Sequence, residues 1–158
     1  MTEPPQWCPP PLAAVATARS TEPLGDALAE RVSGLLKTVR AEHERLGEAL
    51  LVWMHLSGRE QAVALAVRTL GDEQVLECLS LADAELSDTK LVSALATNGQ
   101  PRLAGLVCIK EGETNYLFAR ASNLVSTLDD GELDRMLRAT ARLADDWESR
   151  HTQGGDQW

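Results

Sequence analysis

Apolar residues near the start of the main part of the chain recur at the period of a helix. Their steps of three, four or seven place them on one stripe, at Leu24, Leu28, Val32, Leu35, Val39 and Leu46. Such spacing is typical of an amphipathic helix that buries one side. Gly47 follows this stripe and is predicted to end the helix, because glycine readily takes the left-handed conformation found at helix C-termini.

Three apolar runs then follow at residues 50–56, 61–70 and 74–81. They are separated by the turn-like segments Ser57-Gly58-Arg59 and Gly71-Asp72-Glu73. Runs of this length between turn residues predict β-strands. Links this short join neighbouring antiparallel strands, so the three strands are expected to form a meander.

The second half of the chain predicts a helix, a hairpin and a closing helix. Residues 88–97 read as a short helix with Leu91, Val92 and Leu95 on one side. Residues 102–110 and 114–121 read as strands joined by Glu111-Gly112-Glu113. Residues 129–150 form the last helix, with Asp129 and Glu132 as a capping box. The predicted fold is therefore α+β, an antiparallel sheet of about five strands with flanking helices, in the order α-β-β-β-α-β-β-α.

Neither face of the first two strands is polar. In the second strand Val63, Leu65 and Val67 alternate with alanines, and in the first strand both faces carry large side chains. A half-exposed antiparallel sheet normally shows polar residues at every second position. Either the protein's own helices or another chain must cover the second face. If the first and last helices both pack on the large-residue face, we expect a dimer or partner surface at Leu51, Trp53, His55, Ala62, Ala64, Ala66, Leu106 and Cys108.

Two terminal segments differ in composition from the domain, which we place at residues 24–150. Six of the seven prolines lie in residues 1–23, which are predicted to form a flexible arm that favours polyproline II over helix or sheet. The alternative is an arm whose Trp7 docks on a partner or a second subunit. Residues 151–158 are predicted to form a flexible tail with an exposed Trp158.

Charge and composition narrow the function classes. The chain has 158 residues and a formal net charge of -9, so direct binding to a nucleic-acid backbone is not expected. The N-terminus lacks the pattern of a signal peptide, and no apolar stretch is long enough for a membrane span, which favours a cytosolic protein. Three cysteines without CxxC or Cys/His spacing predict neither disulfides nor zinc; we expect Cys78 and Cys108 to be reduced, small hydrophobes in strands.

The sequence offers few candidates for catalytic or ligand-binding residues. His43, His55 and His151 are far apart in sequence, and no GxSxG, P-loop or GxGxxG motif occurs. We therefore predict no catalytic, cofactor-binding or metal-ligating residues and no enzyme activity. Acidic pairs at residues 129–130 and 145–146 suggest a calcium or small-ligand sensor as the alternative function, but helix capping explains them more simply.

The element order resembles that of the YbjN family, whose fold is similar to that of type III secretion chaperones. The resemblance covers residues 24–150, through the segments ALLVWMHLSG, QAVALAVRTL, EQVLECLSLA, LVSALATNG, PRLAGLVCIKEGETNYLFARA and DDGELDRMLRATARLADDW. It implies a bacterial, homodimeric α+β protein linked to stress responses, without a transferable catalytic signature. We expect a non-enzymatic, chaperone-like module that recruits or stabilises a partner protein, such as a stress-response, DNA-repair or nucleic-acid-binding protein.

Overall fold

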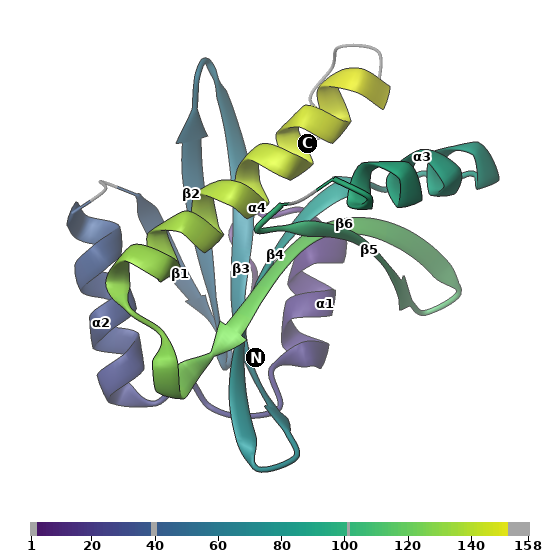
Figure 1. Ribbon diagram of the computed structural model, residues 1–158. Helices are drawn as coiled ribbons and strands as arrows, with labels where there is room; N and C mark the ends of the chain where they lie inside the picture. Colours follow the sequence, from purple (N-terminus) through teal and green to yellow (C-terminus); the bar gives the residue numbers. More distant parts are fainter. Residues whose placement is uncertain (1–2, 39–40, 101, 152–158) are drawn as a thin grey trace.

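A twisted antiparallel sheet lies at the centre of the computed structural model, which describes residues 3–38, 41–100 and 102–151 (Figure 1). The six strands of this described part run in the spatial order β1-β2-β3-β4-β6-β5. They are β1 (Glu42–Leu46), β2 (Ala49–Leu56), β3 (Arg59–Leu70), β4 (Glu73–Asp83), β5 (Gly105–Glu111) and β6 (Thr114–Leu124). The predicted α+β class, the meander and the second hairpin are confirmed.

Helices cover both faces of this sheet (Figure 1). On the face with the large side chains, α2 (Asp26–Thr38) and α4 (Asp130–His151) share a core with Val52, Val63 and Leu65. On the opposite face, α1 (Pro10–Arg19) packs on the alanines of β3 and on Leu79 and Phe118. The fourth described helix, α3 (Asp88–Asn98), lies beside β5 at the edge of the sheet.

The start of α4 follows the predicted capping box. The backbone N–H of Glu132 donates to Asp129 Oδ1 at 2.7 Å, and the backbone N–H of Asp129 donates to Glu132 Oε2 at 3.1 Å. The two side chains thereby satisfy two donors that the first helical turn leaves unpaired. Their carboxylates thus serve the helix start, as the capping interpretation predicts.

The predicted first helix is wrong beyond Thr38, because residues 42–46 form the strand β1. Glu42 pairs with Trp53 and Leu46 with Ala49, so β1 is an edge strand added to the meander. Gly47 does adopt a left-handed conformation, with φ +56°, but in the hairpin turn to β2 rather than after a helix. Val39, which the stripe included, lies outside the described residues.

The expectation that the Pro-rich arm resists helix formation is also wrong. Pro10 and Pro11 occupy the first positions of α1, where a missing N–H costs no helical hydrogen bond. Alanine and leucine then continue the segment, and both favour helix. The prolines therefore begin a helix, and Leu12, Val15 and Ala16 are buried against the sheet.

Within the described residues, no helix is both long and apolar enough to cross a membrane. The predicted C-terminal tail lies outside the described residues except for His151, as does Trp158.

Candidate functional site

The residues predicted to form one partner surface lie on two faces of the sheet. Those on β2 and β3 share the face that α1 covers, since Leu51, Ala62 and Ala64 pack there and side chains alternate along each strand. Leu106 instead belongs to the core under α4, and Cys108 shares its face because side chains alternate along β5. The partner of Leu106 on β6 is Ala119, in the same core, whereas the neighbouring Val107 pairs with Phe118 on the α1 side.

The small-residue face is not left open for another chain beneath α1. Leu51, Ala62 and Ala64 are buried there, together with Leu12 and Ala16 of the helix. Small alanine side chains let the helix approach the sheet closely, as they were expected to do for a partner. The surplus of apolar strand surface is thus largely explained by the chain's own N-terminal helix.

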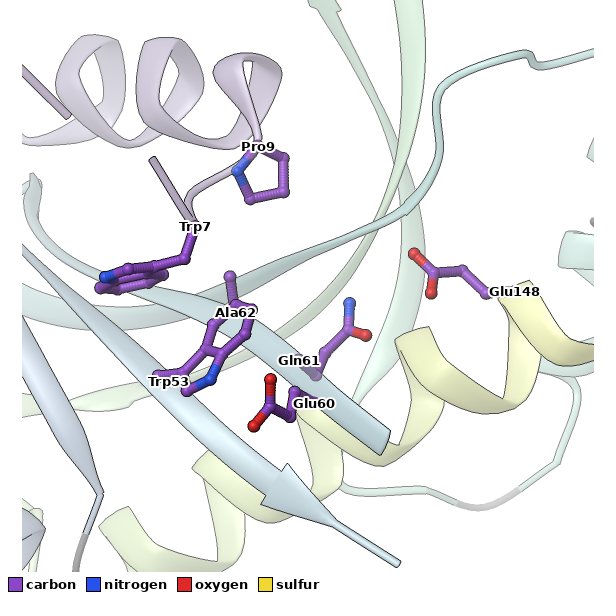
Figure 2. A pocket seen from close by; sticks show the side chains of 7 residues that line it. All are labelled: Trp7, Pro9, Trp53, Glu60, Gln61, Ala62 and Glu148. Atoms are coloured by element: carbon purple, nitrogen blue, oxygen red, sulfur yellow. The ribbon is translucent and has the colours of Figure 1, made fainter. Parts of the chain in front are cut away.

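Besides the exposed His55, Trp53 stays partly accessible at the edge of this covered face. Its ring lies 5.1 Å from the ring of Trp7, at a tilt of 54°. Next to this pair lies a pocket of about 110 Å³, which we call the tryptophan pocket (Figure 2). It is lined by Trp7 and Pro9 before α1, Trp53 on β2, Glu60, Gln61 and Ala62 on β3, and Glu148 on α4.

A buried hydrogen-bond network holds Gln61 at the floor of the tryptophan pocket. Ser80 Oγ donates to the carbonyl of Ala62 at 2.7 Å, so it acts as an acceptor toward Gln61. Gln61 Nε2 donates to Ser80 Oγ at 2.9 Å and to the carbonyl of Leu81 at 3.1 Å. The network fixes the orientation of the amide, with its nitrogen directed into the sheet.

Acidic side chains border the same pocket. Glu60 Oε1 lies 3.0 Å from Nδ1 of His55, and both side chains are about half exposed. Glu148 is nearly buried, and its Oε2 lies 3.7 Å from Arg59, which also pairs with Asp145 at 2.5 Å. Arg59 therefore fastens the C-terminal half of α4 to the start of β3 and fixes this wall of the pocket.

A second accessible surface surrounds α3 and β5, and we call it the α3–β5 surface. Val92, Leu95 and Leu103 are 67%, 71% and 66% exposed. Val92 and Leu95 therefore face away from the core, and Ala94 is the buried residue of this helix. Leu103 also borders a hollow of about 270 Å³ between the segment before β5 and α4.

The outer edge of β5 completes the α3–β5 surface. Asn98 at the end of α3 clamps Leu106, accepting from its N–H and donating to its carbonyl, both at 2.7 Å. The backbone groups of Leu106 therefore point away from β6. Backbone N–H and C=O groups alternate in direction from one residue of a strand to the next. Those of Cys108 and Lys110 therefore also point away from β6. Cys108 lies in this strand as a free cysteine, as expected, and it is exposed.

A buried carboxylate with three arginines lies under the C-terminal end of α1. Arg19 forms a forked pair with Glu77, with Nε–Oε2 and Nη2–Oε1 distances of 2.8 Å, and Arg68 and Arg120 lie 3.5 and 3.7 Å from Oε1. Burial opposes ionisation of Glu77, but the Arg19 hydrogen bonds and the three positive charges outweigh it and lower its pKa. The cluster anchors α1 to β3, β4 and β6.

The histidines and the buried cysteines lie apart from one another. His43 is on β1, His55 on β2, and His151 stacks on Trp147 at the end of α4. Burial raises the pKa of the Cys8 thiol to about 12, and it raises that of Cys78 further. No group of three metal-binding side chains occurs in the described part of the chain.

Neither a family model nor a curated protein matches this chain. The candidate site therefore rests on its geometry. Sequence reasoning missed Trp7 as a pocket wall because it placed the arm outside the fold. It also missed the exposure of Val92, Leu95 and Leu103. The available signal was that these large apolar residues lie close in sequence to the turn-like pair Gly99-Gln100.

Proposed function

We propose that the protein is a non-enzymatic, homodimeric, chaperone-like interaction module that binds a partner protein. The single observation that carries the proposal is the exposure of Val92, Leu95 and Leu103 beside the outer edge of β5. Large apolar side chains gathered on one surface mark contact sites between proteins. The family resemblance supports the same class and suggests a bacterial stress or DNA-repair response as the setting.

The two edges of the sheet differ in a way that favours β5 as the dimer contact. The exposed part of β1 carries Glu42, Glu44 and Arg45, and charges of this kind discourage pairing with another strand. The middle of β5 carries Val107, Cys108 and Ile109 instead. Two copies of β5 can pair antiparallel about a two-fold axis, because such an interface brings the same patch of both subunits together.

The flanking apolar residues fit this arrangement. Asn98 occupies the edge groups of Leu106, so the pairing would centre on Cys108 and Lys110. Leu95 and Val92 stand on the helix beside that strand, where the second subunit would cover them. Burying these side chains in the dimer contact would favour dimer formation by about 25 cal/mol for each Å² of apolar surface removed from water.

Light scattering of the purified full-length protein tests the dimer. We expect the wild type to show twice the chain mass of 17.1 kDa, and Leu95→Asp to show the single-chain mass, because it places a charge in the contact. Leu70→Asp is the matched control, since Leu70 is also exposed, at 54%, but lies at the β3–β4 turn. A wild type that stays monomeric at 0.1 mM, or an unaltered Leu95→Asp dimer, would contradict the proposal.

A further inference from the structure

We propose that the tryptophan pocket binds one arginine side chain of an extended segment in the partner protein. The inference rests on the proposed function as an interaction module, and it adds the chemistry of the partner. It starts from the groups that surround the pocket, namely two indole rings, two carboxylates and one amide (Figure 2).

Gln61, Glu60 and Glu148 line this space with acceptor oxygens, although Glu60 also pairs with His55 and Glu148 with Arg59. Because Gln61 Nε2 is held by Ser80 and Leu81, the amide turns its oxygen away from that network. Carboxylates of Glu60 and Glu148 accept hydrogen bonds and donate none when ionised. Figure 2 shows the Gln61 side chain between these two acids. A ligand group that suits the pocket must therefore be a donor, and preferably a cation.

The indole rings select the same kind of ligand. Trp7 and Trp53 lie on one side of the pocket, across from Glu148 (Figure 2). A cation near the face of an indole is attracted by the ring's electron density, and the attraction is stronger for tryptophan than for other aromatic residues. A guanidinium is planar, stacks on aromatic faces and presents several donors at once, whereas an ammonium is compact and strongly hydrated. The combination of rings and spread acceptors favours arginine over lysine.

The dimensions of the pocket fit a single side chain. About 110 Å³ is too little for a helix, which is about 10 Å across with its side chains. The pocket lies at the β2–β3 hairpin end of the sheet, whereas Val92 and Leu95 lie on α3. A partner segment can therefore insert one residue without using the proposed dimer contact. The net charge of -9 also attracts basic segments at a distance.

The test uses ¹⁵N-labelled full-length protein and a capped peptide, Gly-Ser-Gly-Arg-Gly-Ser-Gly, in buffer of low ionic strength. The control peptide carries citrulline in place of arginine, which keeps the shape and removes the charge. The indole N–H signals of Trp7 and Trp53 are assigned with Trp→Phe variants. We expect both signals to shift saturably with the arginine peptide, and at least five-fold weaker binding of the citrulline peptide.

Variants locate the binding. Glu60→Gln should weaken binding of the arginine peptide at least three-fold, whereas Glu73→Gln should leave it unchanged, because it removes the same charge at the far end of β3 and β4. Equal binding of the two peptides, equal binding of a lysine peptide, or no shift of either indole at 10 mM peptide would overturn the proposal. Leu95→Asp separates the two proposals: a monomeric Leu95→Asp that still binds the arginine peptide supports both, whereas a dimeric wild type that binds no peptide refutes only the pocket assignment.

Discussion

Glu77 shows how a single residue secures the N-terminal helix. Its side chain is 4% exposed, and three guanidinium groups surround it on the α1 face of the sheet. A buried carboxylate is unfavourable unless charges and hydrogen bonds compensate for lost water. Here Arg19 donates two hydrogen bonds to the Glu77 carboxylate, and Arg68 and Arg120 add positive charge from neighbouring strands. Glu77 therefore joins α1 to strands that are far from it in sequence.

Replacing Glu77 with Gln should destabilise the protein by about 2 kcal/mol near neutral pH. A complete loss of one partner of a buried pair costs about 3–5 kcal/mol, and the partly exposed arginines here reduce the loss. Urea unfolding of the two proteins measures the difference. Arg138→Gln serves as the control, because its i,i+4 pair with Asp134 is more exposed and should contribute less than about 1 kcal/mol.

The same substitution should change the dependence of stability on pH. Because the pKa of Glu77 is lower in the folded protein, its contribution is present above the ordinary glutamate pKa of 4.5 and is lost as the pH falls through the folded value. We expect the wild-type advantage over Glu77→Gln to be constant from pH 6 to 7 and to shrink below about pH 4.5. An advantage that grew on acidification would rule out this account.

At the scale of elements, the sequence predicts those with a regular pattern and misses those defined by their neighbours. The buried strands and α4 carry clear periods, and the structure forms them with small shifts at their ends. The segment Glu42–Leu46 has mostly polar residues and becomes a strand only because β2 offers an edge. Leu46 continued the helical spacing by coincidence. Tertiary pairing decided this element, and no local signal in the chain revealed it.

Two glycine substitutions test the β1–β2 turn. A Cβ would meet no atom within 4 Å at either Gly47 or Gly34, so backbone conformation alone decides the effect. Gly47→Ala should lower stability by about 1–2 kcal/mol, because its left-handed conformation disfavours a side chain. Gly34→Ala, within α2, should raise stability by about 0.5–1 kcal/mol. Urea midpoints that move in the same direction for both variants would be inconsistent with these assignments.

At the scale of the whole molecule, the arm that composition places outside the domain completes its second core. A sheet that is apolar on both faces needs cover on both, and this requirement was evident from the alanines of β3. The alternation of side chains could not show which segment supplies the cover, because proline content pointed away from a helix. The same assignment of the arm hid Trp7 and Pro9, so their side of the tryptophan pocket could not be predicted, whereas Trp53 was expected at a dimer or partner face.

Loosening α1 should therefore weaken the whole fold. Leu12 is fully buried between α1 and the sheet, so Leu12→Ala leaves a cavity and should cost about 2–4 kcal/mol in urea unfolding. It should also speed trypsin cleavage after Arg19, because that bond becomes accessible when α1 detaches. Ala18→Ser, on the exposed side of the same helix, is the matched control and should change neither measurement appreciably. If Leu12→Ala left both stability and cleavage unchanged, α1 would be a dispensable attachment, and the second face of the sheet would again need a partner to cover it.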